Sequence, residues 1–161
     1  MRAEFMPKEQ NHTYEKLYYT LWELAGRYSG FCQFRAVGNS HDDRLIPMLE
    51  VGNGAQMIFC VAGIDGTQNL LPRLLIQMAE EYCRAYECGW QLEEFYEVKK
   101  LLDKIRICFL PLLNPDGYEI SQSGFSMIRN PIYRQMLRMQ SIPAKDFGHN
   151  ARGVDICHNF P

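Results

Sequence analysis

The sequence lacks an excess of either charge, long uncharged segments and an apolar leader. Lys and Arg total 17 against 19 for Asp and Glu, so the net charge is −2. This balance offers no broad field to attract nucleic acid or an acidic membrane, and we expect neither as a partner. No uncharged run approaches the roughly 18 residues of a membrane span. The N-terminus contains Glu4, Lys8 and Glu9 and never builds the apolar segment of about 7–15 residues that a secretory signal needs. The chain is therefore expected to be cytoplasmic.

Several familiar site motifs are also missing. The six cysteines include no C-x-x-C pair, which argues against a disulfide framework or a cysteine zinc site and predicts free thiols. Residues 52–54 lack the Lys-Ser/Thr that follows a phosphate-binding loop, and no Gly-x-Ser-x-Gly elbow occurs. Adjacent side chains on an extended segment point to opposite faces. A cysteine hydrolase built on the neighbours Cys157 and His158 is therefore not expected.

What the chain does have is enough apolar sequence for one core. It is 47% hydrophobic and 22% charged, so residues 1–161 are expected to form a single domain, with residues 1–12 flexible. From Thr13, a suitable N-cap, to Tyr28 the apolar residues recur at three- and four-residue steps. This spacing predicts an amphipathic helix.

The following segments predict an α/β sheet. Apolar residues in 31–37 and 45–51 flank a polar connection, as in an antiparallel pair of strands. Residues 57–62 are continuously apolar, which is typical of a strand buried on both faces, and a helical pattern follows directly. A second short helix is expected over roughly 92–102, before another buried strand at 105–113. Strand, helix, helix and strand in this order predict a parallel crossover.

Beyond residue 121 the pattern weakens. A short helix is expected near residues 132–139, and residues 154–157 are expected to form a strand or a tight turn. Three arginines in this region are interpreted as a solvated helix face: Arg129, Arg134 and Arg138.

Four turn segments attached to these apolar elements carry a resemblance. They are Asn39-Ser40 with Arg44-Leu-Ile46, Gly63-Ile-Asp-Gly-Thr-Gln68, Leu113-Asn-Pro-Asp-Gly117, and Asn150-Ala-Arg-Gly-Val-Asp-Ile-Cys-His-Asn-Phe-Pro161. In order and spacing they resemble the zinc metallocarboxypeptidase family, whose segments run Ser-x-x-Gly-Arg-x-Ile, Gly-x-His-Gly-x-Glu, Asn-Pro-Asp-Gly and Gly-Val-Asp-Leu-Asn-Arg-Asn-Phe-Pro. The bacterial carboxypeptidase T and γ-glutamyl-diamino-acid peptidase branch is the most similar. Asp43 stands where the family usually has glycine.

The resemblance implies a fold and a reaction. The fold is α/β, a mixed and mostly parallel sheet with helices on both faces, and its site lies where loops gather at the strand ends. The reaction is zinc-assisted hydrolysis of a peptide bond near a free carboxylate, in which a metal-bound water attacks while a carboxylate acts as general base. Because the similarity covers about the first half of a family catalytic domain, the expected fold is a truncated one.

Residue by residue, the resemblance predicts a weakened zinc site. The first two family ligands, His and Glu, correspond to Asp65 and Gln68, and the neutral amide of Gln68 is a poor zinc ligand. The third ligand and the general base come from a later part of the family domain. The Asn-Arg pair that binds the substrate carboxylate corresponds to Cys157 and His158. Zinc is therefore implied by the family but expected to be weak or absent, and the chain is expected to be catalytically deficient.

Other interpretations stay open. One is an active metallocarboxypeptidase or cell-wall peptide hydrolase completed by a C-terminal half, and another is a domain that binds a peptide, a peptidoglycan stem peptide or a protein partner. A further alternative is a different metal site formed by Asp65, His149, Cys157 and His158. If later strands are absent, a central strand becomes an exposed edge, which predicts self-association or partner binding there.

Overall fold

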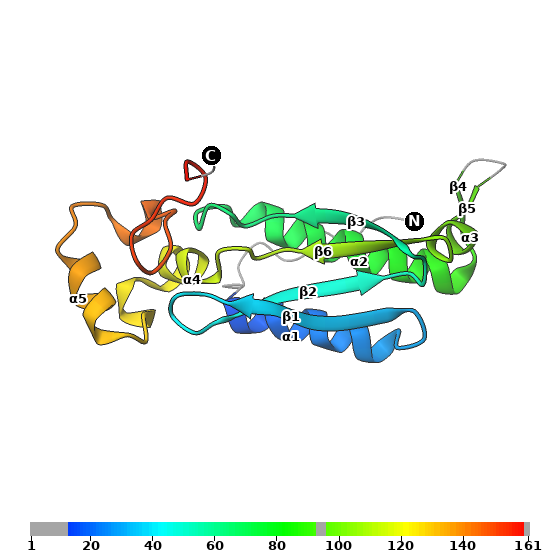
Figure 1. Ribbon diagram of the computed structural model, residues 1–161, viewed down its shortest axis with the longest axis horizontal. Coiled ribbons are helices and arrows are strands. Elements are labelled where there is room, and N and C mark those ends of the chain that lie inside the picture. The colour runs from blue at the N-terminus through cyan, green and yellow to red at the C-terminus, as the bar shows by residue number, and fades with distance from the viewer. Residues whose placement is uncertain (1–12, 93–95, 160–161) are drawn as a thin grey trace.

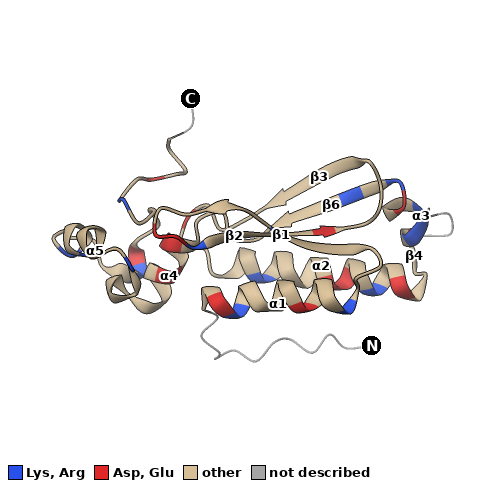
Figure 2. Ribbon diagram, turned by 60° about the horizontal axis from the view of Figure 1, so that its bottom comes forward, with Lys and Arg blue, Asp and Glu red and all other residues tan. Residues whose placement is uncertain are grey.

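A four-stranded sheet with two long helices along one face forms the body of the molecule (Figures 1 and 2). The computed structural model describes residues 13–92 and 96–159. The sheet has the strand order β1-β2-β6-β3, and its strands are β1 (Cys32–Asn39), β2 (Leu45–Val51), β3 (Gln56–Val61) and β6 (Ile105–Leu110). The helices are α1 (Tyr14–Arg27) and α2 (Leu70–Cys88).

The strand directions confirm the mixed α/β class. β1 pairs antiparallel with β2, β2 antiparallel with β6, and β3 parallel with β6. The short polar connection between β1 and β2 favours the antiparallel pairing, whereas α2 and the segment after it supply the crossover that a parallel pair needs. Among the described strands only one of these pairings is parallel, and both long helices lie on the same face (Figure 2). The prediction of a mixed α/β sheet is therefore confirmed. In the described part of the chain, however, the sheet is mostly antiparallel and the long helices cover only one of its faces.

The main core lies between the sheet and the two helices. Thr13 caps α1 as predicted, because its side chain accepts a hydrogen bond from the N–H of Lys16. The helix then places Leu17, Leu21 and Leu24 against the sheet, spaced as the sequence pattern requires. Burying one such side chain stabilises the fold by roughly 1.5–3 kcal/mol. Fully buried partners from the other elements include Leu49, Val51, Ala79, Cys83, Leu102 and Phe109.

The segment after α2 differs from the helix expected over 92–102. Gln91–Leu92 (β4) and Tyr96–Glu97 (β5) form an antiparallel pair, and helix α3 is confined to Val98–Leu102. The pairing gives the backbone groups near Leu92 partners in a hairpin rather than in a helix. Residues 93–95 lie outside the described part of the chain. The strand expected at 105–113 ends at Leu110, because Pro111 has no N–H for the ladder.

A second, smaller core forms beyond β6. Helix α4 (Pro115–Ser123) was not predicted, although Asn114 at its N-cap and Pro115 in its first turn are standard start signals. Two 3-10 turns, η1 (Phe125–Met127) and η2 (Ala144–Asp146), flank α5 (Pro131–Arg138). The predicted helix near 132–139 is thereby confirmed, and residues 154–157 form turns rather than a strand. The buried members of this core are Ile120, Ile128, Leu137 and Phe147.

β3 is more exposed than its sequence suggests. It borders β6 on one side and lies at the edge of the described sheet. Met57 and Phe59 are 54% and 57% exposed, so the expectation of a strand buried on both faces is wrong for this structure. An apolar run shows that a strand has side chains suited to burial, but whether they are buried depends on the elements that pack against the strand.

The flexible segment expected at residues 1–12 lies outside the described residues. Among the helices of the described part, none is long and apolar enough to cross a membrane.

Candidate functional site

Three loops meet around the side chain of Asn114. This residue follows β6, and its amide Nδ2 donates to the carbonyl oxygens of Ile64 (3.1 Å) and Gly148 (2.9 Å). Its Oδ1 accepts from the N–H of Gly117 at 3.0 Å, and its own N–H donates to the oxygen of Gly63 at 2.8 Å. One buried amide therefore joins the loop after β3, the start of α4 and the loop that follows η2.

Glycines let these loops approach closely. The N–H of Gly66 donates to the oxygen of Gly148 at 2.9 Å. A Cβ on Gly66 would lie 2.2 Å from the carbonyl carbon of Gly117, and one on Gly148 would lie 2.6 Å from Oδ1 of Asp65. A side chain at Gly66 would overlap the backbone of Gly117, and one at Gly148 would displace the carboxylate of Asp65. The turn motifs of the sequence are thus explained by the packing of one loop on another.

The carboxylate of Asp65 is occupied within its own loop. Its Oδ1 accepts hydrogen bonds from the N–H of Thr67 at 2.7 Å and from the hydroxyl of Thr67 at 2.6 Å. Its backbone oxygen accepts from the N–H of Gln68 at 3.2 Å. This is the arrangement in which an aspartate closes a turn on its own backbone. Asp65 therefore has a structural role in the loop, whatever else it binds.

The last described loop is organised by Asp155. Its Oδ1 accepts from the N–H of Cys157 at 2.9 Å, and its Oδ2 lies 2.7 Å from Nδ1 of His158 and 3.8 Å from Nε2 of His149. The hydrogen bond from His158 is the main cause that holds the pKa of Asp155 below its usual range. Both histidines therefore lie beside a carboxylate, and His158 itself is exposed.

Cys157 lies within electrostatic reach of Asp65. Partial desolvation, followed by the negative charges of Asp65 and Asp155, raises the pKa of the Cys157 thiol. A thiol that resists ionisation is a weaker nucleophile and a weaker metal ligand. The structure thus brings two of the sequence-predicted positions, Asp65 and Cys157, to the same region, while the roles assigned to them stay predictions.

The described residues do not assemble a cluster of zinc ligands. Across residues 13–92 and 96–159, no three His, Cys, Asp or Glu side chains come together as a metal would need. The alternative set of Asp65, His149, Cys157 and His158 is therefore not assembled. The physical reason is that the two histidines gather around Asp155, while Oδ1 of Asp65 is bound to Thr67. At Asp65 and Gln68, the two positions that the sequence resemblance predicts as ligands, the donors are one carboxylate and one neutral amide, and this pair does not fit a catalytic zinc.

A buried ionic network lies behind the loops. Arg44 is 4% exposed. Its Nη1 lies 2.6 Å from Oδ2 of Asp42 and 3.1 Å from Oδ1 of Asp116, and its Nη2 donates to the oxygen of Met127 at 2.6 Å. The hydroxyl of Ser40 also donates to Oδ1 of Asp116, at 2.6 Å. The network ties the β1–β2 connection to α4, and Ser40 and Arg44 of the first turn motif were the sequence signal for it.

The carboxylate of Asp42 extends this network to α5. It accepts hydrogen bonds from the N–H groups of Arg129 (2.7 Å) and Asn130 (2.8 Å). Arg129 is exposed, as expected of a solvated residue, but its Nη1 also donates to the oxygen of Asp43 at 2.9 Å. Asp43 has a φ of 58°, a left-handed conformation that glycine adopts most easily. The backbone thus explains why glycine is usual at this position.

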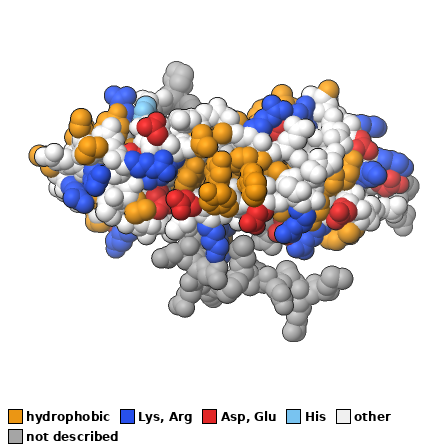
Figure 3. Space-filling view, turned by 90° about the horizontal axis from the view of Figure 1, so that it is seen from below, with side chains coloured by type: hydrophobic (Ala, Val, Ile, Leu, Met, Phe, Trp, Pro, Cys, Tyr) orange, Lys and Arg blue, Asp and Glu red, His pale blue; other side chains and the backbone are white. Residues whose placement is uncertain are grey.

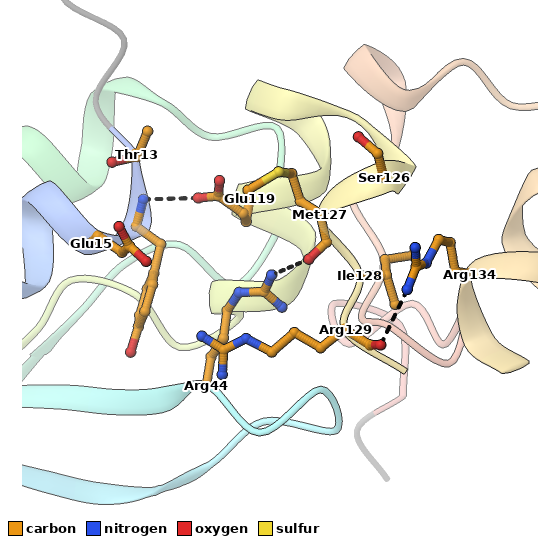
Figure 4. A pocket seen from close by; sticks show the side chains of 10 residues that line it. Thr13, Glu15, Arg44, Glu119, Ser126, Met127, Ile128, Arg129 and Arg134 are labelled. Carbon is orange, nitrogen blue, oxygen red and sulfur yellow. Dashed lines mark hydrogen bonds between the residues drawn. The ribbon is translucent and has the colours of Figure 1, made fainter. Parts of the chain in front are cut away.

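A cavity of about 360 Å³ borders the network (Figure 4). Arg44, Arg129 and Arg134 line it together with Glu15 and Glu119. One oxygen of Glu119 accepts from the N–H of Tyr14 at 2.9 Å, at the start of α1. Because both charge signs surround the cavity, its lining indicates no preference for an anion or a cation.

Comparison with known proteins identifies related sequences and folds. Residues 17–161 match the family described as zinc carboxypeptidase. The human carboxypeptidase N catalytic chain is 25% identical over 165 residues, which cover 94% of this chain and 31% of that protein. Carboxypeptidase D from Rattus norvegicus is 32% identical over 156 residues, covering 92% of this chain and 10% of the relative. This chain thus spans about a third or less of these two relatives.

Solved structures show the same fold at lower identity. Bovine thrombin-activatable fibrinolysis inhibitor, in complex with tick carboxypeptidase inhibitor, superposes with a TM-score of 0.58 at 18% identity, over 71% of this chain and 34% of that one. Carboxypeptidase A from Helicoverpa armigera gives a TM-score of 0.53 at 17% identity, over 73% and 30% of the two chains.

Proposed function

Because the chain belongs to the zinc carboxypeptidase family, we propose that it is a carboxypeptidase-like domain that binds peptides without hydrolysing them. The three loops around Asn114 meet beyond the ends of β3 and β6, where a site at the strand ends is expected. The side chains at the two family ligand positions differ from a zinc-binding pair. The scaffold is thus retained while the metal chemistry is lost.

The observation that carries this proposal is the state of Asp65. To bind a metal through Oδ1, the carboxylate would have to give up two hydrogen bonds from Thr67. Each such bond contributes about 0.5–1.5 kcal/mol, and more when the acceptor is charged. Gln68 offers only a neutral amide oxygen in place of an anionic ligand. The neutral amide lowers zinc affinity in any geometry, and the Thr67 hydrogen bonds lower it for binding through Oδ1 of Asp65.

Peptide binding is assigned to the last loop. Cys157 and His158 occupy the positions at which the family binds a substrate carboxylate, and Asp155 holds His158 by a 2.7 Å contact. A protonated imidazole carries a charge and one free N–H, but it lacks the bidentate fork of arginine. The expected ligand is a peptide with a free carboxylate, including a cell-wall stem peptide, bound more weakly than an arginine would allow.

An active metallocarboxypeptidase or cell-wall peptide hydrolase is the second candidate. It is favoured by the family itself and by the fact that the chain spans 31% of human carboxypeptidase N. In that case a part of the catalytic domain outside these 161 residues would have to supply the remaining zinc ligands and the general base. The two candidates differ in metal content and in turnover, and both are measurable.

The deciding experiment measures zinc stoichiometry and affinity by elemental analysis and isothermal titration. We expect no stoichiometric zinc in the parent chain and at least a tenfold gain in affinity for the Asp65→His/Gln68→Glu variant, because His and Glu are ordinary zinc ligands. The control Asp146→His/Gln135→Glu makes the same chemical changes at exposed positions and should gain nothing. Stoichiometric zinc at sub-micromolar affinity in the parent, or turnover of a carboxyl-ended peptide, would refute the proposal.

A further inference from the structure

Two buried cysteines meet in the main core. Cys32 is the first residue of β1, and in the register of β1 with β2 it is paired with the core residue Val51. Cys83 lies on α2, on the helix face that also buries Ile76 and Ala79. The two cysteines are 3% and 0% exposed. One residue of the sheet and one of the helix layer therefore share the same interior.

The contact between the two cysteines is a side-chain hydrogen bond. The thiol of Cys83 donates to the sulfur of Cys32, and this bond, followed by burial, raises the pKa of the Cys83 thiol. Neighbouring side chains hold the two segments together at the same point, because the ring of Phe31 is stacked on that of Tyr86 with centroids 3.9 Å apart. Tyr86 follows Cys83 by three residues and is therefore its neighbour on the surface of α2. The packing of the start of β1 on α2 thus brings the thiols together.

A disulfide needs more than two nearby cysteines. The two side chains must point toward each other, with Cβ atoms about 3.5–4.5 Å apart. Thiols that share a hydrogen bond already point toward each other. Cys60 and Cys108 do not, although their strands are paired: Cys60 is opposite Phe109 and packs against the main core, whereas Cys108 belongs to the apolar cluster on the other face of the sheet.

We propose that Cys32 and Cys83 form a reversible disulfide that links β1 to α2, with a low-molecular-weight disulfide as the oxidant. The reaction consists of two exchanges. The thiolate of one cysteine attacks the small disulfide, which gives a mixed disulfide and releases one small thiolate. The thiolate of the other cysteine then attacks the protein sulfur of the mixed disulfide and releases the second small thiolate. The protein loses two protons and two electrons, and the small disulfide becomes two thiols.

The fold controls when this exchange takes place. Only a thiolate attacks a disulfide, and the raised pKa of Cys83 keeps that thiol protonated in the closed core. Both cysteines are buried, and hydrophobic side chains gather on the side of the molecule where α1 and β1 lie (Figure 3). A polar oxidant therefore reaches the pair during folding or when the core opens. The finished disulfide is shielded from reduction in the same way.

The link would stabilise the fold through the length of chain that it closes. Joining residues 32 and 83 closes a loop of about 50 residues. A cross-link of this length restricts mainly the unfolded chain and is expected to favour the folded state by roughly 10³-fold, provided that the bond forms without strain. Because folding and oxidation belong to one thermodynamic cycle, the folded chain should form the disulfide with an equilibrium constant larger by the same factor.

The test refolds the reduced 161-residue chain from urea in glutathione redox buffers of graded composition. After free thiols are blocked by alkylation, peptide mapping by mass spectrometry without reductant identifies each link. We expect a link between Cys32 and Cys83, with an equilibrium constant about 10³-fold larger for the folded chain than for the chain kept in urea. The oxidised chain should have a Tm about 8–16 °C above that of the reduced chain.

Matched variants separate the link from the loss of a buried side chain. Cys83→Ala and Cys108→Ala each remove a thiol that is fully buried, so both lose some stability from the cavity that is left. Only Cys83→Ala should abolish the difference in Tm between oxidising and reducing buffers, whereas Cys108→Ala should keep it. Because each variant is compared with itself in the two buffers, its own stability does not affect the result.

Each other outcome overturns the proposal. A folded chain that carries glutathione at Cys32 or Cys83, with no link between them, means that the two side chains cannot close. Equal equilibrium constants for the folded and unfolded chains mean that the core does not favour the bond, and a lower Tm after oxidation means that the bond strains the core. Links between other cysteines in place of the expected one, or a redox-dependent Tm in Cys83→Ala, refute the pairing.

Discussion

Removing the guanidinium of Arg44 is expected to destabilise the fold more than any comparable change at the surface. Arg44→Met keeps much of the side-chain length but leaves Asp42 and Asp116 without their common cation. These carboxylates are almost fully buried, at 1% and 0% exposed. Breaking a buried ion pair by deleting one partner costs about 3–5 kcal/mol, because the remaining charge is uncompensated.

The hydrogen bonds that remain around Asp42 and Asp116 determine how much stability Arg44→Met loses. Asp42 keeps two backbone N–H donors from Arg129 and Asn130, and Asp116 keeps the hydroxyl of Ser40 at 2.6 Å. With these bonds intact we expect a loss near the lower end, about 3 kcal/mol. For a chain of this size that corresponds to a fall in Tm of about 6–12 °C.

The assay is urea unfolding followed by circular dichroism, with Arg35→Met as the matched control. Arg35 also pairs with a carboxylate, that of Glu50 at 2.9 Å, but its own side chain is 56% exposed and Glu50 keeps Arg106 at 2.7 Å. Because Arg35 lies largely in solvent and the buried carboxylate of Glu50 keeps Arg106, losing Arg35 is expected to cost about 1 kcal/mol or less. The reasoning is refuted if Arg44→Met lowers the free energy of unfolding by less than 1 kcal/mol, or by no more than Arg35→Met does.

Two further predictions concern a backbone conformation and a titration. Asp43 has a φ of 58°, so Asp43→Gly should raise the free energy of unfolding by about 0.5 kcal/mol and Asp43→Val should lower it by about 1–2 kcal/mol; equal urea midpoints for the two variants would contradict this. His158 is the main cause of the lowered pKa of Asp155, so NMR titration should show that this pKa rises in His158→Ala. A lowered carboxyl pKa contributes stability above the unfolded pKa of about 3.9, and that contribution is lost as the pH falls through the folded pKa. An unchanged Asp155 titration in His158→Ala would show that the hydrogen bond is not its cause.

The sequence by itself determined the elements whose signals are local. Helical spacing identified α1 and α2, and the Thr13 cap identified where α1 begins. Apolar runs found β3 and β6, and the intervening helices predicted their parallel pairing. The four turn motifs identified the zinc carboxypeptidase family because glycine, proline and asparagine at fixed spacing encode turns. Each helix, strand and turn signal is contained in a window of about 20 residues or fewer, and the order of these signals along the chain indicated the crossover and the family.

Only the tertiary structure decided the state of the candidate site. Arg44 and Asp116 lie 72 positions apart in the sequence, and Asn114 and Ile64 lie 50 apart, so no local pattern could pair them. The same holds for the exposed edge of β3, whose apolar run predicts burial but not the neighbour that would provide it. The sequence alone shows that residue 65 is an aspartate. That the carboxylate there closes a turn on Thr67 was not, because the choice between a hydrogen bond and a ligand depends on which groups the folded loops bring within 3 Å.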